Sequence, residues 1–211
     1  IPDFDRYSAC HALNQKECAF IFAEDQGKLV TDINLIIAHM GGGISVGAHY
    51  KGRIIDSTNG NGEGPMTPER AGALPNDLLA DLCYSGKYTY EEIHRLLYGS
   101  GGLKAYLGTS DCKMLVEKSK TDARIKLLLD AMVYQISCSI CSMAAALCGQ
   151  IDGVILTGGL AHSNYIIDGI LKRIEFLAPV TIYPGEYELQ GLAKGAIRVL
   201  TGSEAAKIYN G

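Results

Sequence analysis

Two side chains that could bind a phosphoryl group or a carboxylate, His11 and Arg70, lie beside turn-forming or helix-starting residues. Arg70 is the only arginine in the turn-rich segment 56–77. A planar guanidinium with five donors commonly holds a carboxylate or a phosphoryl group, but surface pairing with Glu63 or Glu69 would explain Arg70 equally well. His11 stands near the start of an expected helix, where a histidine is more often a capping or surface residue. The residues alone leave both alternatives open.

A triple glycine, Gly41 to Gly43, separates two apolar runs, 33–38 and 44–50. Without Cβ atoms at this turn, backbone N–H groups can close on a ligand, most naturally a phosphate chain. The alternative is a plain glycine-rich hairpin. Neither GxxxxGK[ST] nor a GxGxxG that opens a helix after a strand is present, so the pattern differs from the commoner phosphate loops.

Two further segments combine turn residues with groups that could contact a ligand. Gly158-Gly159 ends a continuous apolar run, 153–157. A second glycine-rich loop, 99–113, ends in an expected helix start at Ser110-Asp111. The Asp111 carboxylate could cap that helix or meet a ribose hydroxyl, and capping is the commoner use.

Composition places the chain among ordinary globular proteins. It has 211 residues, of which 47% are hydrophobic and 20% charged, enough for a substantial core. The net charge of −4 gives no reason to expect nucleic acid or an anionic membrane as a partner. Seven cysteines, an odd number scattered through apolar segments, favour a reducing, cytoplasmic compartment over a disulfide framework. Because the sequence starts at Ile1 without a methionine or a secretory pattern, we expect a fragment of a longer product.

Hydrophobic periodicity predicts an α/β order of elements. A helix over 8–23 precedes an antiparallel meander of strands, and a Thr89/Glu92 capping box marks a later helix start. The final β-α-β-α order implies parallel pairing, with ligands past the carboxyl ends of the strands. The expected strands are 33–38, 44–50, 53–56, 153–157 and 180–183, with a Lys51-Gly52 turn in the meander, and the remaining helices are 77–83, 89–98, 122–148, 163–176 and 188–200.

The longest expected helix contains eighteen residues without a charge, 131–148, so a membrane span must be considered. Gln135 and several serines interrupt this run and no second such segment follows, which favours a helix buried on most of its faces. Cys138-x-x-Cys141 lies inside it without a second pair or a nearby histidine, so we expect packing rather than metal or redox chemistry.

Six segments in order resemble the acetate and butyrate kinase family, within the sugar kinase, heat-shock chaperone and actin superfamily. They are HALNQK (11–16), AHMGGGISVGAHYKGR (38–53), GEGPMTPERAG (62–72), AYLGTSD (105–111), LTGGLAHS (156–163) and YPGE (183–186). The resemblance implies a ribonuclease H-like ATPase half-domain over 1–211, a nucleotide-binding C-terminal domain with a helical insertion at about 75–150. The family's N-terminal domain would then be missing from this chain.

The activity implied by the resemblance is reversible transfer of the γ-phosphoryl group of ATP to a short-chain fatty acid, with Mg²⁺, giving an acyl phosphate and ADP. By the same resemblance His11 and Arg70 would be catalytic. The implied nucleotide contacts are His39, Gly41, Gly42, Gly43, Asp111, Lys113, Gly158, Gly159, Ala161, His162 and Ser163. Glu186 or Glu188 would serve Mg²⁺, since the register of that segment is ambiguous.

Two departures from the family pattern matter. Lys113 stands where an arginine is common, which keeps the charge but loses planar stacking. The missing first domain would carry a phosphate loop, a substrate-binding arginine and an aspartate, so we expect this chain to be inactive alone. A nucleotide-binding module without turnover is the alternative, and an interaction protein is a third. The acyl chain stays open, and a homo-oligomer is implied by the resemblance only.

Overall fold

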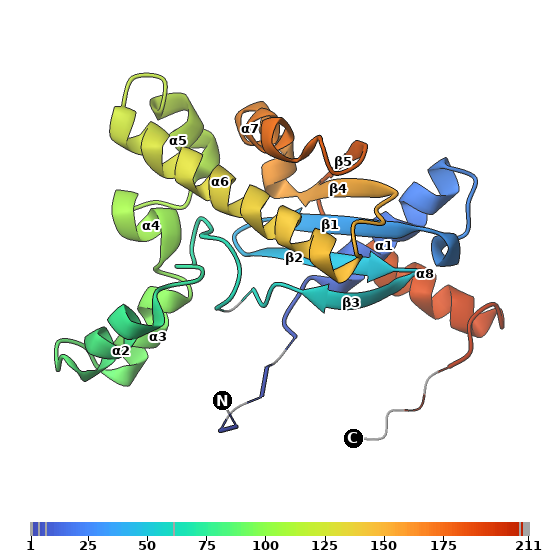
Figure 1. Cartoon of the computed structure of the whole chain (residues 1–211), viewed down its shortest axis with the longest axis horizontal. Helices are drawn as coiled ribbons and strands as arrows, with labels where there is room; N and C mark the ends of the chain where they lie inside the picture. The colour runs from blue at the N-terminus through green and yellow to red at the C-terminus, as the bar shows by residue number, and fades with distance from the viewer. Residues whose placement is uncertain (1, 4, 7, 61, 207, 209–211) are drawn as a thin grey trace.

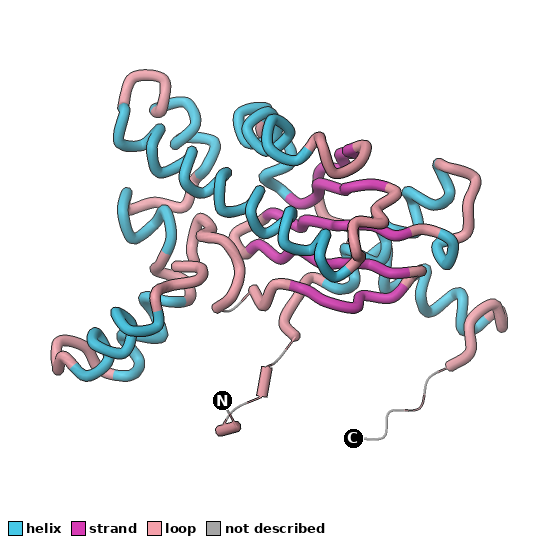
Figure 2. The backbone as a smooth tube through the Cα atoms, viewed as in Figure 1, coloured by secondary structure: helices cyan, strands magenta, loops and turns pink. Residues whose placement is uncertain are grey.

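A single five-stranded sheet forms the centre of the computed structural model, which describes residues 2–3, 5–6, 8–60, 62–206 and 208. The strand order is β3-β2-β1-β4-β5. The strands are β1 (Asn34–Met40), β2 (Ile44–Tyr50), β3 (Arg53–Ser57), β4 (Gly153–Gly158) and β5 (Val180–Pro184). In Figure 2 they lie as the middle layer, between helices.

The pairing of the strands follows the predicted order. β1, β2 and β3 form the antiparallel meander, and β1, β4 and β5 are parallel neighbours. The second hairpin turns at Lys51 and Gly52, both with positive φ, as the predicted tight turn requires. The carboxyl ends of β1, β4 and β5 therefore meet at one edge of the sheet, where the sequence predicted ligands.

Helices cover both faces of the sheet (Figure 1). α6 (Ala123–Ala146) crosses one face in contact with β1, β2 and β3, beside α7 (Asn164–Ile174). α1 (Ala12–Asp25) lies against β1 on the other face, beside α8 (Glu188–Leu200). The short 3₁₀ turns η1 (Val30–Asp32) and η2 (Gly159–His162) precede β1 and follow β4.

Alternation along the strands divides the core into two layers. Ile36, Ala38 and Met40 of β1 pack with α6 and α7, whereas Leu35 and Ile37 pack with α1. Each of these five side chains is at most 1% exposed. Burying one Leu, Ile or Met side chain stabilises the fold by about 1.5–3 kcal/mol, so the position of β1 at the centre of the sheet is strongly determined.

The first helix begins later than the sequence predicted and has an unusual inner face. It starts at Ala12 rather than Ser8, because His11 has a non-helical backbone (φ −76°, ψ 62°) at the N-cap. Asn14, Gln15 and Glu17 are buried, none more than 1% exposed. Buried polar groups of this kind require partners, and the partners of Gln15 are described below.

A helical arm joins β3 to α6 at the side of the sheet (Figure 1). It contains α2 (Asn76–Tyr84), α3 (Tyr90–Leu97), α4 (Gly102–Leu107) and α5 (Cys112–Lys118). The predicted Thr89/Glu92 capping box is present at α3. The expectation of a continuous loop over 99–113 is wrong because α4 forms there. Fully buried Leu103 anchors this helix, and Gly102 lies too close to the carbonyls of Thr67 and Arg70 for a Cβ.

α6 is long and apolar enough to cross a membrane, judged by length and composition alone, and no other helix in the described part of the chain is. Here its Leu129, Met132 and Ile136 are fully buried against the sheet, as predicted for a packed helix. The expectation for the cysteines is half right, since Cys141 packs against the core while Cys138 is exposed. No group of three or more metal-binding side chains occurs within the described ranges.

Candidate active site

Two histidine rings stack at the edge of the sheet where the parallel strands end. His11 precedes α1 and His39 is the penultimate residue of β1. Their ring centroids are 3.9 Å apart, with 20° between the planes. His39 is 2% exposed, while His11 is only half-buried and covers it. The sequence placed His39 in the turn, but the structure places it in the strand beneath His11.

Arg70 reaches the glycine turn from its own loop. Its Nη1 donates a 2.6 Å hydrogen bond to the Gly60 carbonyl. A Cβ atom on Gly43 would lie 2.7 Å from the Arg70 Cζ, so the guanidinium occupies the space that this glycine leaves. The alternative of pairing with Glu63 or Glu69 is not observed, since Glu63 pairs with Arg6 and Glu69 accepts a hydrogen bond from Ser110. In the described part of the chain, Arg70 forms no ion pair.

His11, Arg70 and Glu186 interact electrostatically, which brings three predicted residues from distant segments into one site. Burial lowers the pKa of His11, and the Arg70 charge lowers it further, while Glu186 opposes both effects. Burial also lowers the pKa of His39 to about 3, with a smaller contribution from His11. Both rings are therefore neutral at neutral pH.

The glycine turn is held from two sides. The Gly41 N–H donates a 2.9 Å bond to the Gly43 carbonyl, and the Thr67 hydroxyl donates a 2.7 Å bond to the Gly42 carbonyl. None of these three glycines has a positive φ. The glycines matter at this turn because they lack a Cβ atom, which leaves the backbone groups beside Arg70 accessible.

The remaining predicted nucleotide contacts lie in two places, at the start of α5 and directly after β4. Asp111 is the N-cap of α5, as the capping alternative predicted, because its carboxylate accepts from the Met114 N–H at 3.0 Å. Lys113 is exposed on the first turn of that helix. Gly158 ends β4 with a φ of 91°, and its Cβ would collide with the Met40 backbone. Gly159, Ala161 and His162 form η2, and Ser163 follows as the N-cap of α7.

The two candidate metal ligands differ in their surroundings. Glu186 is exposed after β5 and acts on His11. Glu188 begins α8 and acts on the thiol of buried Cys18 instead. Mg²⁺ characteristically takes one or two protein carboxylates together with phosphate oxygens and water. A single carboxylate beside His11 would suit such an ion, and the electrostatic interaction with His11 makes Glu186 the better candidate of the two.

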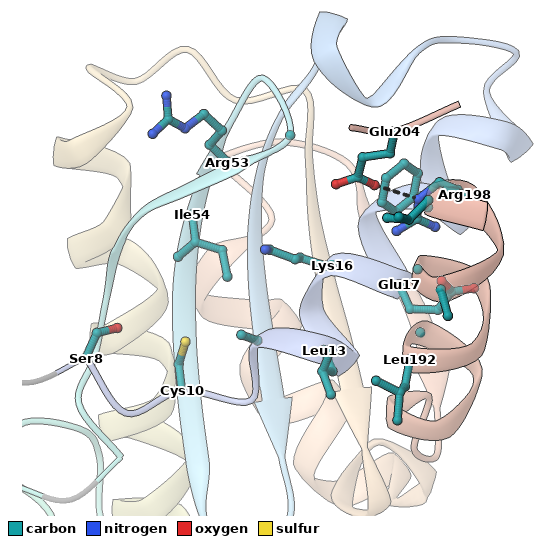
Figure 3. A pocket seen from close by; sticks show the side chains of 17 residues that line it. Ser8, Cys10, Leu13, Lys16, Glu17, Arg53, Ile54, Leu192, Arg198 and Glu204 are labelled. Carbon is teal, nitrogen blue, oxygen red and sulfur yellow. Dashed lines mark hydrogen bonds and ion pairs between the residues drawn. The ribbon is translucent and has the colours of Figure 1, made fainter. Parts of the chain in front are cut away.

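A groove of about 620 Å³ runs between α1, α8 and β3 (Figure 3). Ser8 and Cys10 line one end, next to the segment that carries His11. At the other end, Arg198 lies over the Phe20 ring and pairs with Glu204 at 3.0 Å. No residue of the predicted site lines this groove, so the groove and the site are separate features.

Solved structures share this arrangement of elements. The acetate kinase of Porphyromonas gingivalis matches 90% of this chain with a TM-score of 0.81 and 21% identity, and the match covers 55% of that protein. A propionate kinase from Francisella tularensis subsp. tularensis SCHU S4 matches 87% of this chain with a TM-score of 0.77 and 19% identity, over 53% of its own length. The fold is thus the one found in about half the length of each of these two chains.

The chain belongs to the acetokinase family, whose model matches residues 6–185. It is 46% identical over 211 residues to a protein of Clostridium botulinum (strain Alaska E43 / Type E3) named probable butyrate kinase. It is 47% identical over 211 residues to a protein of Phocaeicola vulgatus with the same name. These matches cover 99% of this chain but only 59% and 60% of the relatives, so the chain spans about three fifths of their length.

Sequence reasoning missed three buried polar residues beneath His11, namely Gln15, Ser45 and His49. A signal was available in the second strand. Ser45, Gly47 and His49 alternate with the apolar residues Ile44, Val46 and Ala48, which places the polar set on one face of the strand. Only the structure shows that α1, rather than solvent, covers that face.

Proposed function

We propose that the protein to which this chain belongs transfers the γ-phosphoryl group of ATP reversibly to the carboxylate of a short-chain fatty acid. Butyrate or a branched analogue would be the acceptor, and the products would be an acyl phosphate and ADP. The observation that carries the proposal is the meeting of His11, Arg70 and the Gly41 to Gly43 turn at the carboxyl edge of the sheet.

In this reaction the protein residues form no covalent bond with the substrates. A carboxylate oxygen of the acid forms a bond to the γ-phosphorus, while the bond from that phosphorus to the bridging oxygen breaks and ADP leaves with the electron pair. No proton has to move. The transition state resembles metaphosphate, so catalysis depends on positioning and on neutralising charge. Arg70 would supply a fixed positive charge and bidentate hydrogen bonds. Neutral His11 would donate a hydrogen bond from its ring.

The nucleotide would lie along the edge formed by the ends of β1 and β4. The open turn at Gly41 to Gly43 would hold the phosphates, with Asp111 and Lys113 toward the ribose and base, and the Gly159 to Ser163 segment beside the adenosine. Members of the acetokinase family use ATP and Mg²⁺. Glu186 would hold Mg²⁺ with its waters, and the bound ion would neutralise phosphate charge.

A small cavity next to Arg70 suits an aliphatic acid. It measures about 100 Å³, and Arg70 is among the residues that line it. Leu74, Leu79, Leu97 and Tyr98 supply the apolar part of its lining. A cation beside a short apolar space matches the two ends of a short-chain carboxylate, so we assign the acyl chain to this cavity.

Turnover is proposed for the full-length gene product, in the cytoplasm and as a homo-oligomer, and not for this chain alone. The chain lacks about two fifths of the length of its relatives, and His11, with Arg70, forms one wall of a site that a second domain would close. Saturable binding of MgADP to the 211-residue chain, measured by calorimetry, is expected. Acyl-hydroxamate formation by this chain from ATP, butyrate and hydroxylamine is not expected, and observing it would overturn this part of the proposal.

The decisive test is the same hydroxamate assay on the full-length gene product. Arg70→Ala and His11→Ala are each expected to lower kcat at least roughly 10²-fold, the size seen when one charge-stabilising donor is lost. Arg95→Ala removes the same side-chain type as Arg70 from an exposed position of α3 and serves as the matched control. Unchanged rates in the His11 and Arg70 variants would refute the assigned roles and favour a nucleotide-binding module without turnover.

A further inference from the structure

A chain of buried polar side chains connects His11 to the interior of the protein. Gln15 lies on the first turns of α1, and Ser45 and His49 lie on β2. Gln15 and Ser45 are completely buried, and His49 is 1% exposed. Polar groups buried this deeply are normally all hydrogen-bonded, so the position of each proton can be deduced.

The proton on the Ser45 hydroxyl has one available direction. The Ser45 Oγ accepts from the His11 backbone N–H at 3.1 Å and from the Gln15 side-chain amide at 3.0 Å. A hydroxyl oxygen has two acceptor lone pairs and one proton. With both lone pairs used, its proton is left for the third neighbour, the His11 Nδ1 at 2.8 Å. The His11 Nδ1 must therefore be an acceptor, which places the ring proton on Nε2.

The Gln15 amide cannot be turned to reverse this argument. Its Nε2 also lies 3.3 Å from the Ser45 backbone carbonyl, which only accepts hydrogen bonds. Its Oε1 then faces the His49 Nε2 at 3.1 Å, so His49 must carry its proton on that nitrogen. The His49 Nδ1 has no partner in the described structure, as an unprotonated nitrogen tolerates best. Burial lowers the pKa of His49 to about 4, consistent with a neutral ring.

Gly47 makes room for this arrangement. A Cβ atom at position 47 would collide with the Gln15 Oε1. Gly47 lies between Ser45 and His49 on the same face of β2, and Gln15 occupies the gap that it leaves. The sequence of the strand is thus explained by the hydrogen bonds beneath the Gln15 amide: Ser45 accepts from it, Gly47 leaves space for it, and His49 donates to it.

We propose that Ser45, Gln15 and His49 are positioning residues that hold His11 as the tautomer protonated on Nε2, with that N–H directed to the transferring phosphoryl group. The identity of the group that this N–H contacts rests on the proposed function. The positions of the protons rest on the structure. In an imidazole ring the two nitrogens point to different sides, so Nε2 faces away from Ser45 when Nδ1 faces it. If the His11 ring carried protons on both nitrogens, Ser45 would have to accept a third hydrogen bond. The same buried side chains therefore also keep His11 neutral.

The groups around His11 agree with this role. Arg70 and Glu186 act on it from two loops, His39 stacks on its face, and Ser45 holds its inner edge. A neutral N–H donor beside the fixed charge of Arg70 can hydrogen-bond a phosphoryl oxygen, whereas the other tautomer would present a lone pair and repel it.

The protons can be measured directly on the 211-residue chain. Long-range ¹H–¹⁵N NMR of ¹⁵N-histidine-labelled protein distinguishes protonated from unprotonated ring nitrogens, and a His11→Gln sample assigns the His11 signals among the five histidines. We expect His11 and His49 to carry their protons on Nε2 at neutral pH. A His11 proton on Nδ1 would overturn the inference, whether or not any variant folds.

Two variants test the function of this hydrogen-bonded set of side chains, Ser45, Gln15 and His49. Gln15→Met removes the amide and leaves the Ser45 hydroxyl free to accept, so the His11 Nδ1–H tautomer should become populated. Ser45→Ala removes the hydroxyl itself, and the Nδ1 resonance should move toward that of an imidazole without a donor. In the full-length product each variant should lower kcat roughly 10- to 100-fold, with little change in KM. Ser137→Ala removes another buried serine, one that bonds only within α6, and should change neither property.

The outcomes separate this inference from the proposed function. If the His11 tautomer and kcat are both unchanged in folded Gln15→Met, the positioning role of Ser45, Gln15 and His49 is overturned. Absence of acyl phosphate formation by the full-length product, with the His11 proton still found on Nε2, would overturn the proposed function while supporting the deduced protons.

Discussion

A Cβ atom placed on Gly43 would lie 2.7 Å from the Cζ of Arg70 and 2.9 Å from its Nη1, so the glycine turn and the guanidinium occupy adjoining space. Both come from segments that the sequence marked separately. The same guanidinium is fixed by the Gly60 carbonyl. The turn therefore does more than leave the backbone open: it determines where the positive charge of Arg70 can lie.

Gly43→Ala is expected to push Arg70 out of position and lower kcat/KM of the full-length product roughly 10- to 100-fold. The loss of stability should be small, because the displaced atoms are the end of a flexible side chain. Gly195→Ala, on α8, is the matched control, since its Cβ would make only an ordinary 3.6 Å contact with the Arg198 Nη2. Steady-state kinetics and thermal unfolding of both variants check the prediction, and equal kinetic effects would contradict it.

Acid is expected to destabilise the fold through the buried histidines. His11, His39 and His49 all have lowered pKa values, with His39 at about 3 and His49 at about 4. The unfolded chain binds protons at these residues below about pH 6.5, while the folded chain does not until a lower pH. The unfolded state thus holds more protons in this window, and stability falls as pH decreases from about 6.5 to 4.

Each such histidine contributes a slope of at most about 1.4 kcal/mol per pH unit. Urea unfolding of the 211-residue chain at several pH values between about 7.5 and 4.5 measures the total slope. His49→Gln, which keeps a donor near Gln15, should reduce it, most clearly below about pH 6. A slope that His49→Gln leaves unaltered would show that His49 is not held neutral by burial.

Gly158 and Gly159, adjacent in sequence, are expected to respond very differently to alanine. Gly158 has a φ of 91°, and its Cβ would collide with the backbone of Met40 at the end of β1. A Cβ on Gly159 would meet no atom within 4 Å. Gly158→Ala should therefore lower the free energy of unfolding by at least about 1–3 kcal/mol, and Gly159→Ala by much less. Urea denaturation of both variants tests this, and similar losses would contradict it.

The sequence was informative wherever a local rule determines structure. The antiparallel meander, the Lys51-Gly52 turn, the Thr89/Glu92 capping box and the parallel β4 and β5 pairing were all predicted. The prediction of a loop over 99–113 was wrong because contacts with residues 67–71 anchor α4 there. No local sequence pattern reveals such contacts. Backbone approach between distant segments is a tertiary property, and glycine alone does not indicate it.

For the site, the sequence pointed to two half-buried residues and missed the buried residues that support them. His11 and Arg70 were singled out by the resemblance to the kinase family, since their types alone left other roles open. Gln15 and His49 were not, because a polar residue on an apolar helix or strand is expected to face solvent unless the covering element is known. The stacking of His11 on His39 depends on the N-cap position of one and the strand position of the other, which only the folded arrangement combines.

The cavity next to Arg70 gives a prediction about acyl-chain length. Leu97 and Leu79 line it from the helical arm, together with Arg70. Leu97→Ala should enlarge it and raise kcat/KM for a five- or six-carbon acid relative to butyrate, since one methylene in an apolar pocket is worth about 1–3 kcal/mol. Leu78→Ala, at an exposed position of α2, is the control. Hydroxamate assays of the full-length variants with acids of increasing length measure the ratio. A ratio that Leu97→Ala leaves at its original value would place the acyl chain elsewhere, on a wall supplied by the other domain, while the roles of His11 and Arg70 would still be tested by their own variants.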